Sequence, residues 1–187
     1  GIVATMANVM QADAWHQAAP AFVGFDINDA AHSSRGAFIR AIEEAAAIVA
    51  GAHLDILSAL TDGRAVAEGT VTFTGGSSAG SLWPTIIAGV TGLDTLVTPA
   101  PEATSYGAAR LAARGVGADL PPMGEPDRVV RADAAEHDAY RLIAERWHRV
   151  YRDVLAISGA DLTPLFTPPG AARAALAHRP TTADTLG

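Results

Sequence analysis

The order of secondary-structure signals in the middle of this chain constrains its fold most. The predicted elements are a strand at residues 67–74, a helix at 81–91, a strand at 93–99 and a helix at 104–113. The strands are rich in β-branched and aromatic residues, whereas the first helix repeats apolar residues along one face. This succession favours two parallel strands in an α/β sheet, because a helix between parallel strands carries the chain back to the starting edge.

Longer helices are predicted on both sides of this unit. Apolar residues recur at helical spacing over residues 34–60, where Gly51 is a candidate end or bend. A second long helix is predicted over 132–157. Residues 15–27 contain a proline between apolar residues and are interpreted as irregular or weakly extended.

Composition narrows the functional classes. The 187 residues fit one domain, and 13 basic against 20 acidic residues argue against nucleic acid or an anionic membrane as a partner. No apolar run approaches the roughly 20 residues of a membrane span. The chain has no cysteine, which permits a reducing compartment, and we expect a cytoplasmic protein. All 13 basic residues are arginine, so the lysine of a phosphate-binding loop is absent.

The segment TFTGGSSAGSLW, residues 72–83, joins a predicted strand to a helix and admits two interpretations. In the first, residues 76–80 form the G-x-S-x-G elbow of a hydrolase with Ser78 as nucleophile. The candidate partners along the chain are Asp94 or Asp119 as acid and His137 or His148 as base. A hydrolase sheet has several strands before its elbow, whereas this sequence predicts one strand preceded by a long helix.

In the second interpretation, the same small residues bind a nucleotide. Gly75 and Gly76 carry no side chain, so a phosphate or an adenine can lie against the main chain. The following helix would direct free amides and the positive end of its dipole at the same point. Ser77 and Ser78 could add hydroxyl groups. A plain glycine turn with a serine helix cap remains an alternative.

Two segments resemble the C-terminal domain of FGGY carbohydrate kinases. They are VTFTGGSSAGSLWPTIIAGVTGL at residues 71–93 and PEATSYGAARLAA at 101–113. The shared features are a glycine-rich turn, a Leu82 and Trp83 helix start, and an E-A-T-x-x-G-A-A helix at 102–109, whose small face suits close packing. Three further segments, at 15–27, 39–49 and 135–151, are most similar to the autoinducer-2 kinase group of that family.

The resemblance implies a ribonuclease H-like or actin-like ATPase domain of α/β class with a long C-terminal helix. Residues 1–165 would form an incomplete C-terminal nucleotide-binding domain, and 166–187 a flexible tail. Such kinases transfer the γ-phosphate of ATP, with Mg²⁺, to a hydroxyl of a sugar or sugar-like polyol.

By position, the resemblance also assigns residues to the nucleotide. Gly75, Gly76 and Ser77 would contact the α-phosphate and adenosine, and Gly80 would lie near the adenine. Glu44 would match a glutamate of the family, although it could equally be an ordinary exposed helix carboxylate.

Departures from the family pattern leave a degenerate, regulatory kinase-fold module as an alternative. Ser77 replaces a third glycine, Thr85 a glutamine, and Ala88 with Gly89 an Ala-Asp pair. The resemblance places the family's N-terminal domain, the antiparallel opening of the second domain and the catalytic aspartate upstream of residue 1. We therefore expect no catalytic residue and no metal ligand in this chain, and no phosphoryl transfer by the chain alone. The sequence leaves a homodimer open.

Overall fold

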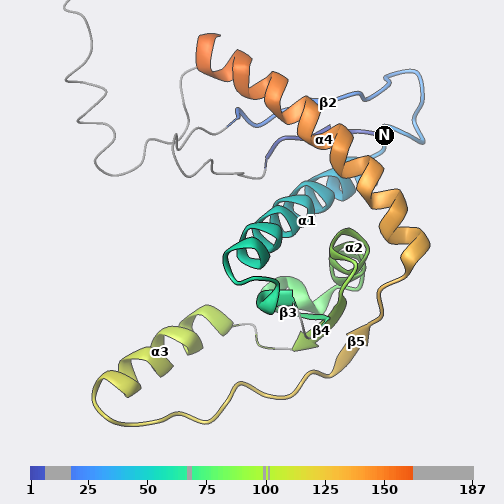
Figure 1. Ribbon diagram of the computed structural model, residues 1–187. Coiled ribbons are helices and arrows are strands. Elements are labelled where there is room, and N and C mark those ends of the chain that lie inside the picture. Colours follow the sequence, from blue (N-terminus) through green and yellow to red (C-terminus); the bar gives the residue numbers. More distant parts are fainter. Residues whose placement is uncertain (7–17, 67–68, 99, 101, 162–187) are drawn as a thin grey trace, which may run out of the picture.

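A computed structural model describes residues 1–6, 18–66, 69–98, 100 and 102–161 (Figure 1). In chain order the helices and strands are β1 (Val3–Ala4), β2 (Phe22–Val23), α1 (Arg35–Leu60), η1 (Arg64–Val66), β3 (Thr70–Thr74), η2 (Gly76–Ala79), α2 (Leu82–Thr91), β4 (Asp94–Thr98), α3 (Ala103–Gly115), β5 (Arg128–Val130) and α4 (Ala134–Asp161). The tail predicted over 166–187 and part of the irregular segment at 15–27 lie outside the described residues. No helix in the described part of the chain is both long and apolar enough to cross a bilayer.

The sheet that carries the predicted unit has the strand order β3-β4-β5. β3 and β4 are parallel and in register from Thr70 opposite Asp94 to Thr74 opposite Thr98, which confirms the predicted parallel pair. α2 connects them as the crossover helix. β5 is antiparallel to β4 and was not predicted, because three residues are too few to show a strand period.

Both predicted long helices are present. α1 begins after Ser34, whose side chain accepts a hydrogen bond from the main-chain N–H of Ala37 at 3.2 Å. Gly51 does not end this helix; it lies where α2 approaches, since a Cβ there would be 3.2 Å from Val90 Cγ1. α4 runs to Asp161, four residues beyond the predicted end at 157.

Helices α1, α2 and α4 pack together on one side of the sheet (Figure 1). One buried cluster joins Ala47 of α1, Ile86 and Ile87 of α2 and Tyr140 of α4, and partly buried β3 side chains pack against it. A second cluster joins α1 and α4 to the β1–β2 pair, where the Trp147 indole donates to the Ala4 carbonyl at 2.8 Å. The core is therefore mainly a helix–helix interface beside a small sheet.

α3 differs from the other helices because none of its residues is buried. Figure 1 shows it standing apart from α1, α2 and α4. Its small-residue face was expected to pack closely, but a Cβ at Gly107 would meet no atom within 4 Å. The expected close packing of this helix is thus not seen among the described residues.

Helices α2 and α4 approach each other closely where Gly89 of α2 meets Tyr140 of α4. A Cβ at Gly89 would lie 2.6 Å from Tyr140 Cδ2, so only glycine fits there.

The Tyr140 hydroxyl accepts a hydrogen bond from Arg40 Nη2 at 2.9 Å, and Arg40 Nε donates to Glu44 at 2.8 Å. Burial, and then the Glu44 charge, raise the pKa of Tyr140, so the phenol stays protonated at neutral pH.

Replacing Gly89 with alanine should lower the free energy of unfolding by about 1–3 kcal/mol, because the added methyl group overpacks a buried ring. The midpoint of urea unfolding measures this. Gly107→Ala, on the exposed face of α3, is the matched control and should be neutral or raise stability by about 0.5–1 kcal/mol. Equal stability of Gly89→Ala and the wild type would contradict the close approach.

Candidate functional site

The carboxyl ends of the two parallel strands lie side by side, at the edge where ligands bind in open α/β sheets. Thr74 ends β3 opposite Thr98, which ends β4, and the Thr74 hydroxyl donates to the Thr98 carbonyl at 3.0 Å. The loop at residues 75–81 follows β3 directly, so it lies at this edge; we call it the glycine loop. The four predicted site residues all belong to it, at Gly75, Gly76, Ser77 and Gly80.

The first two glycines have different reasons to be glycine. Gly75 has φ 97° and ψ −172°, a conformation that side chains with a Cβ rarely adopt. Gly76 has no such restriction, and a Cβ there would meet no atom within 4 Å. Open space therefore lies beside the main chain at Gly76.

Within the glycine loop, Gly76–Ala79 form a short 3-10 helix, η2, before the next helix begins. η2 was not predicted from the sequence; α2 then begins at Leu82 with Ser81 as its N-cap, close to the predicted start. Among the described residues, no acceptor bonds to the main-chain N–H groups of Gly76, Ser77 or Ser81. Three donors without a described acceptor in one loop, next to a helix N-terminus, suit an anionic ligand.

The Ser78 side chain faces inward, not toward solvent. It is 7% exposed, and its hydroxyl donates to the Gly75 carbonyl at 2.7 Å. His137 Nδ1 lies 2.9 Å from the Gly89 carbonyl oxygen instead. The nucleophile–base hydrogen bond that the hydrolase interpretation requires is therefore missing at Ser78.

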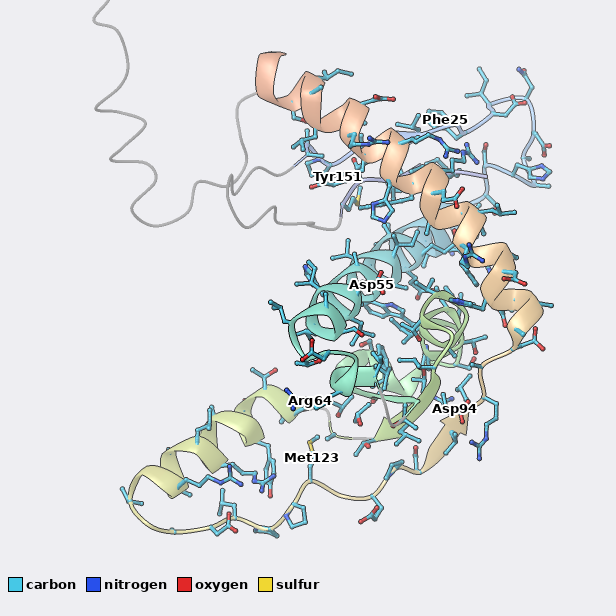
Figure 2. The ribbon with its side chains drawn as sticks, in the orientation of Figure 1. Phe25, Asp55, Arg64, Asp94, Met123 and Tyr151 are labelled. Atoms are coloured by element: carbon cyan, nitrogen blue, oxygen red, sulfur yellow. The ribbon has the colours of Figure 1, made fainter. Side chains whose placement is uncertain are left out.

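The other proposed hydrolase partners are also engaged elsewhere. His148 stacks edge-on against Trp147 with ring centroids 5.2 Å apart, and burial lowers its pKa. Asp94, labelled in Figure 2, accepts from the Ala132 main chain at 2.9 Å and pairs with Arg131; the Ala132 bond and then Arg131 lower its pKa. Asp119 is an exposed loop residue. Nothing brings these groups to Ser78.

Arg128 on β5 holds the glycine loop from the far side of β4. Its Nη2 donates to the Ser78 carbonyl at 3.0 Å and to the Gly80 carbonyl at 2.8 Å. Sequence reasoning missed this residue, because the contacts span 50 and 48 positions and depend on an unpredicted strand.

A buried polar atom beside the loop has no partner in the described residues. Trp83, in the first turn of α2, packs against Phe73 near the end of β3 with ring centroids 5.7 Å apart. Its indole Nε1 is buried and donates to nothing described. An unpaired buried donor at this place is consistent with a polar ligand that the protein alone does not supply.

Glu44 does not lie at the glycine loop. It pairs with Arg40 and, with Ile143 and Trp147 of α4, lines a cavity of about 370 Å³ next to β1. Its side chain is 16% exposed, so it is not an ordinary solvated carboxylate either. A second cavity, of about 450 Å³ between α1, α2 and α4, includes Asp55 (Figure 2). Neither cavity is lined by glycine-loop residues.

The described residues contain no group of three or more histidine, cysteine, aspartate or glutamate side chains that could hold a metal ion.

A family model matches more than half of the chain. The model of the FGGY family of carbohydrate kinases, C-terminal domain, matches residues 8–116. This range contains the glycine loop, both parallel strands and α3.

Curated relatives match nearly the whole chain. An autoinducer-2 kinase from Salmonella paratyphi B and one from Photorhabdus laumondii are each 34% identical over 177 residues. One from Yersinia pestis bv. Antiqua is 35% identical over 179 residues. Each match covers 91% of this chain but 33% of the relative, so the chain spans about a third of the length of these proteins.

Solved structures share the fold. A xylulose kinase from Rhodospirillum rubrum superposes with a TM-score of 0.57 at 22% identity, covering 75% of this chain and 28% of that one. A xyloylose kinase from Brucella ovis gives a TM-score of 0.54 at 24% identity, covering 74% and 28%. Together with the family model, they confirm the predicted fold class, an α/β domain with the fold of the C-terminal domain of FGGY carbohydrate kinases.

Replacing Ser78 with alanine should lower the free energy of unfolding by about 0.5–1.5 kcal/mol, because it removes the hydrogen bond to the Gly75 carbonyl. Ser77→Ala, at an exposed position of the same turn, should change stability by less than about 0.5 kcal/mol. A fluorophosphonate probe should label neither the wild type nor the variants at this turn. Covalent labelling of Ser78 would instead support the hydrolase interpretation.

Proposed function

Because this chain belongs to the FGGY family of carbohydrate kinases, we propose that it is the nucleotide-binding part of an ATP-dependent kinase. The kinase transfers the γ-phosphoryl group of ATP to a hydroxyl group of a sugar or sugar-like polyol. Residues 1–165 would form an incomplete C-terminal nucleotide-binding domain. The rest of the enzyme would correspond to the part of the curated relatives that this chain does not match.

Nucleotide binding is supported by the turn at the end of β3, which has open space beside its main chain and several main-chain N–H groups without a described acceptor. The unpaired N–H groups of Gly76 and Ser77 would bind the α-phosphate, and the open space at Gly76 would admit the adenosine. Gly80 would lie near the adenine, where a side chain would narrow the approach. These contacts need no lysine, in agreement with the composition.

The chain's own contribution to the reaction would be positioning and charge stabilisation. Mg²⁺ bound with the nucleotide would supply positive charge that offsets the charge developing during transfer. Main-chain donors from the glycine loop would hold the α-phosphate and so position the nucleotide for transfer. A carboxylate base on the acceptor hydroxyl would come from the remainder of the enzyme.

The acceptor we propose first is autoinducer-2. Support comes from curated relatives named autoinducer-2 kinase, which are 34–35% identical over 91% of this chain. The xylulose kinases are 22% and 24% identical and support the fold alone.

A second candidate, a regulatory module with weakened nucleotide binding, is favoured by the departures from the family pattern. The structure accommodates each departure. Ser77 is exposed with a free N–H, the Thr85 hydroxyl donates to the Ser81 carbonyl at 3.0 Å, and the Tyr140 ring occupies the space beside Gly89. These contacts preserve the loop, so we rank the active kinase first.

Replacing Gly76 with valine should weaken Mg²⁺–ATP binding at least tenfold, or about 1.4 kcal/mol, because a branched side chain fills the space beside the free N–H groups. The fold should survive, since the added Cβ meets no atom within 4 Å. Isothermal titration calorimetry of the intact protein measures this, with Ser78→Ala as the control that leaves binding nearly unchanged. ATP binding by Gly76→Val at wild-type affinity would contradict the assigned site, and absence of binding by the wild type would favour the regulatory module.

A further inference from the structure

We propose that Arg128 is a positioning residue for the nucleotide, acting through the glycine loop. This inference rests on the proposed function, because it assigns a role in ATP binding. No resemblance in the sequence pointed to Arg128, which lies after the segment matched by the family model, at residues 8–116.

The sheet topology brings Arg128 to the site. β5 is antiparallel to β4, so β5 begins at the edge where β4 ends. Arg128, its first residue, pairs with Val97, and the preceding Asp127 donates its main-chain N–H to the Val97 carbonyl at 3.0 Å. The Arg128 guanidinium therefore starts from the same sheet edge as the glycine loop.

The contacts of Arg128 fix two peptide groups of the loop. One nitrogen, Nη2, bridges the carbonyl oxygens of Ser78 and Gly80 at 3.0 Å and 2.8 Å. Hydrogen bonds from an ionised donor are roughly twice as strong as those between neutral groups. Arg128 is half-buried, and its Nε is enclosed without an acceptor among the described residues, so the side chain has little freedom to leave the loop.

Holding these carbonyls also sets the direction of the opposite N–H groups. A trans peptide directs its C=O and N–H to opposite sides. With the Gly80 carbonyl turned toward Arg128, the N–H of Ser81 points away from it, and no described acceptor bonds to that N–H. Arg128 thus keeps the Ser81 N–H directed away from β5, and its positive charge favours an anion at the same edge.

Arg131 provides a matched control within the same segment. It lies three residues further along, directly after the other end of β5; its side chain is 78% exposed, and it pairs with Asp94 rather than with the loop. Removing either arginine changes the net charge equally, but only Arg128 contacts the glycine loop.

The experiment measures steady-state kinetics of the intact kinase with Arg128→Gln, Arg128→Lys and Arg131→Gln. Arg128→Gln should raise KM for ATP at least tenfold and leave KM for the acceptor within about twofold. Arg128→Lys keeps the charge and one hydrogen bond, so it should recover part of the loss. Arg131→Gln should match the wild type in both constants. Amide hydrogen exchange at residues 76–81 should become faster only in the Arg128 variants.

Several outcomes would overturn the proposal. An unchanged KM for ATP in Arg128→Gln would do so, as would equal increases in both KM values, which indicate a general structural role. If Arg128→Gln does not fold, Arg128→Met decides, because it keeps an apolar stem but no donor, and wild-type ATP affinity and loop exchange in that variant exclude a positioning role. If the wild-type protein neither binds ATP nor phosphorylates an acceptor, the proposed function itself is wrong. If the wild type is active and the Arg128 variants have the same KM for ATP, only the role of Arg128 is wrong.

Discussion

Parallel pairing of β3 with β4 is the constraint on which the candidate site depends. Parallel strands require a crossover, and α2 supplies it, so both strands end at the same edge of the sheet. The glycine loop follows one strand end, and antiparallel β5 enters beside the other. Main-chain donors and a guanidinium group therefore meet at one place, although they are 50 positions apart in the chain.

Helix packing provides the support for that edge. α2 follows the glycine loop and is held against α4 by the contact between Gly89 and Tyr140, which leaves no room for a side chain on the glycine. Tyr140 is tied in turn to α1 through Arg40. A loop that binds through its main chain needs such a rigid base, because its donors keep their direction only if the flanking elements do not move.

Much of the candidate site was predictable, since its glycine and serine residues are contiguous and follow a strand signal. Gly75, Gly76, Ser77 and Gly80 do lie in one turn at a strand end, and their contacts with a nucleotide stay a prediction. Arg128 was not predictable, because its role depends on where a three-residue strand pairs. The surroundings of Glu44 were not predictable, since its contacts with Arg40 and with the cavity beside α4 depend on how α1 and α4 pack; its match to a family glutamate stays a prediction.

The sequence by itself determined the order of elements, the parallel strand pair, the two long helices and the family, because these depend on local periodicity and on contiguous motifs. The tertiary structure alone decided three features: the Ser78 side chain turns inward, the Tyr140 ring packs directly against Gly89, and an arginine from β5 binds the loop. Those features are contacts between distant segments, and no local pattern of residues specifies which distant side chain will fill a space or bond to a carbonyl.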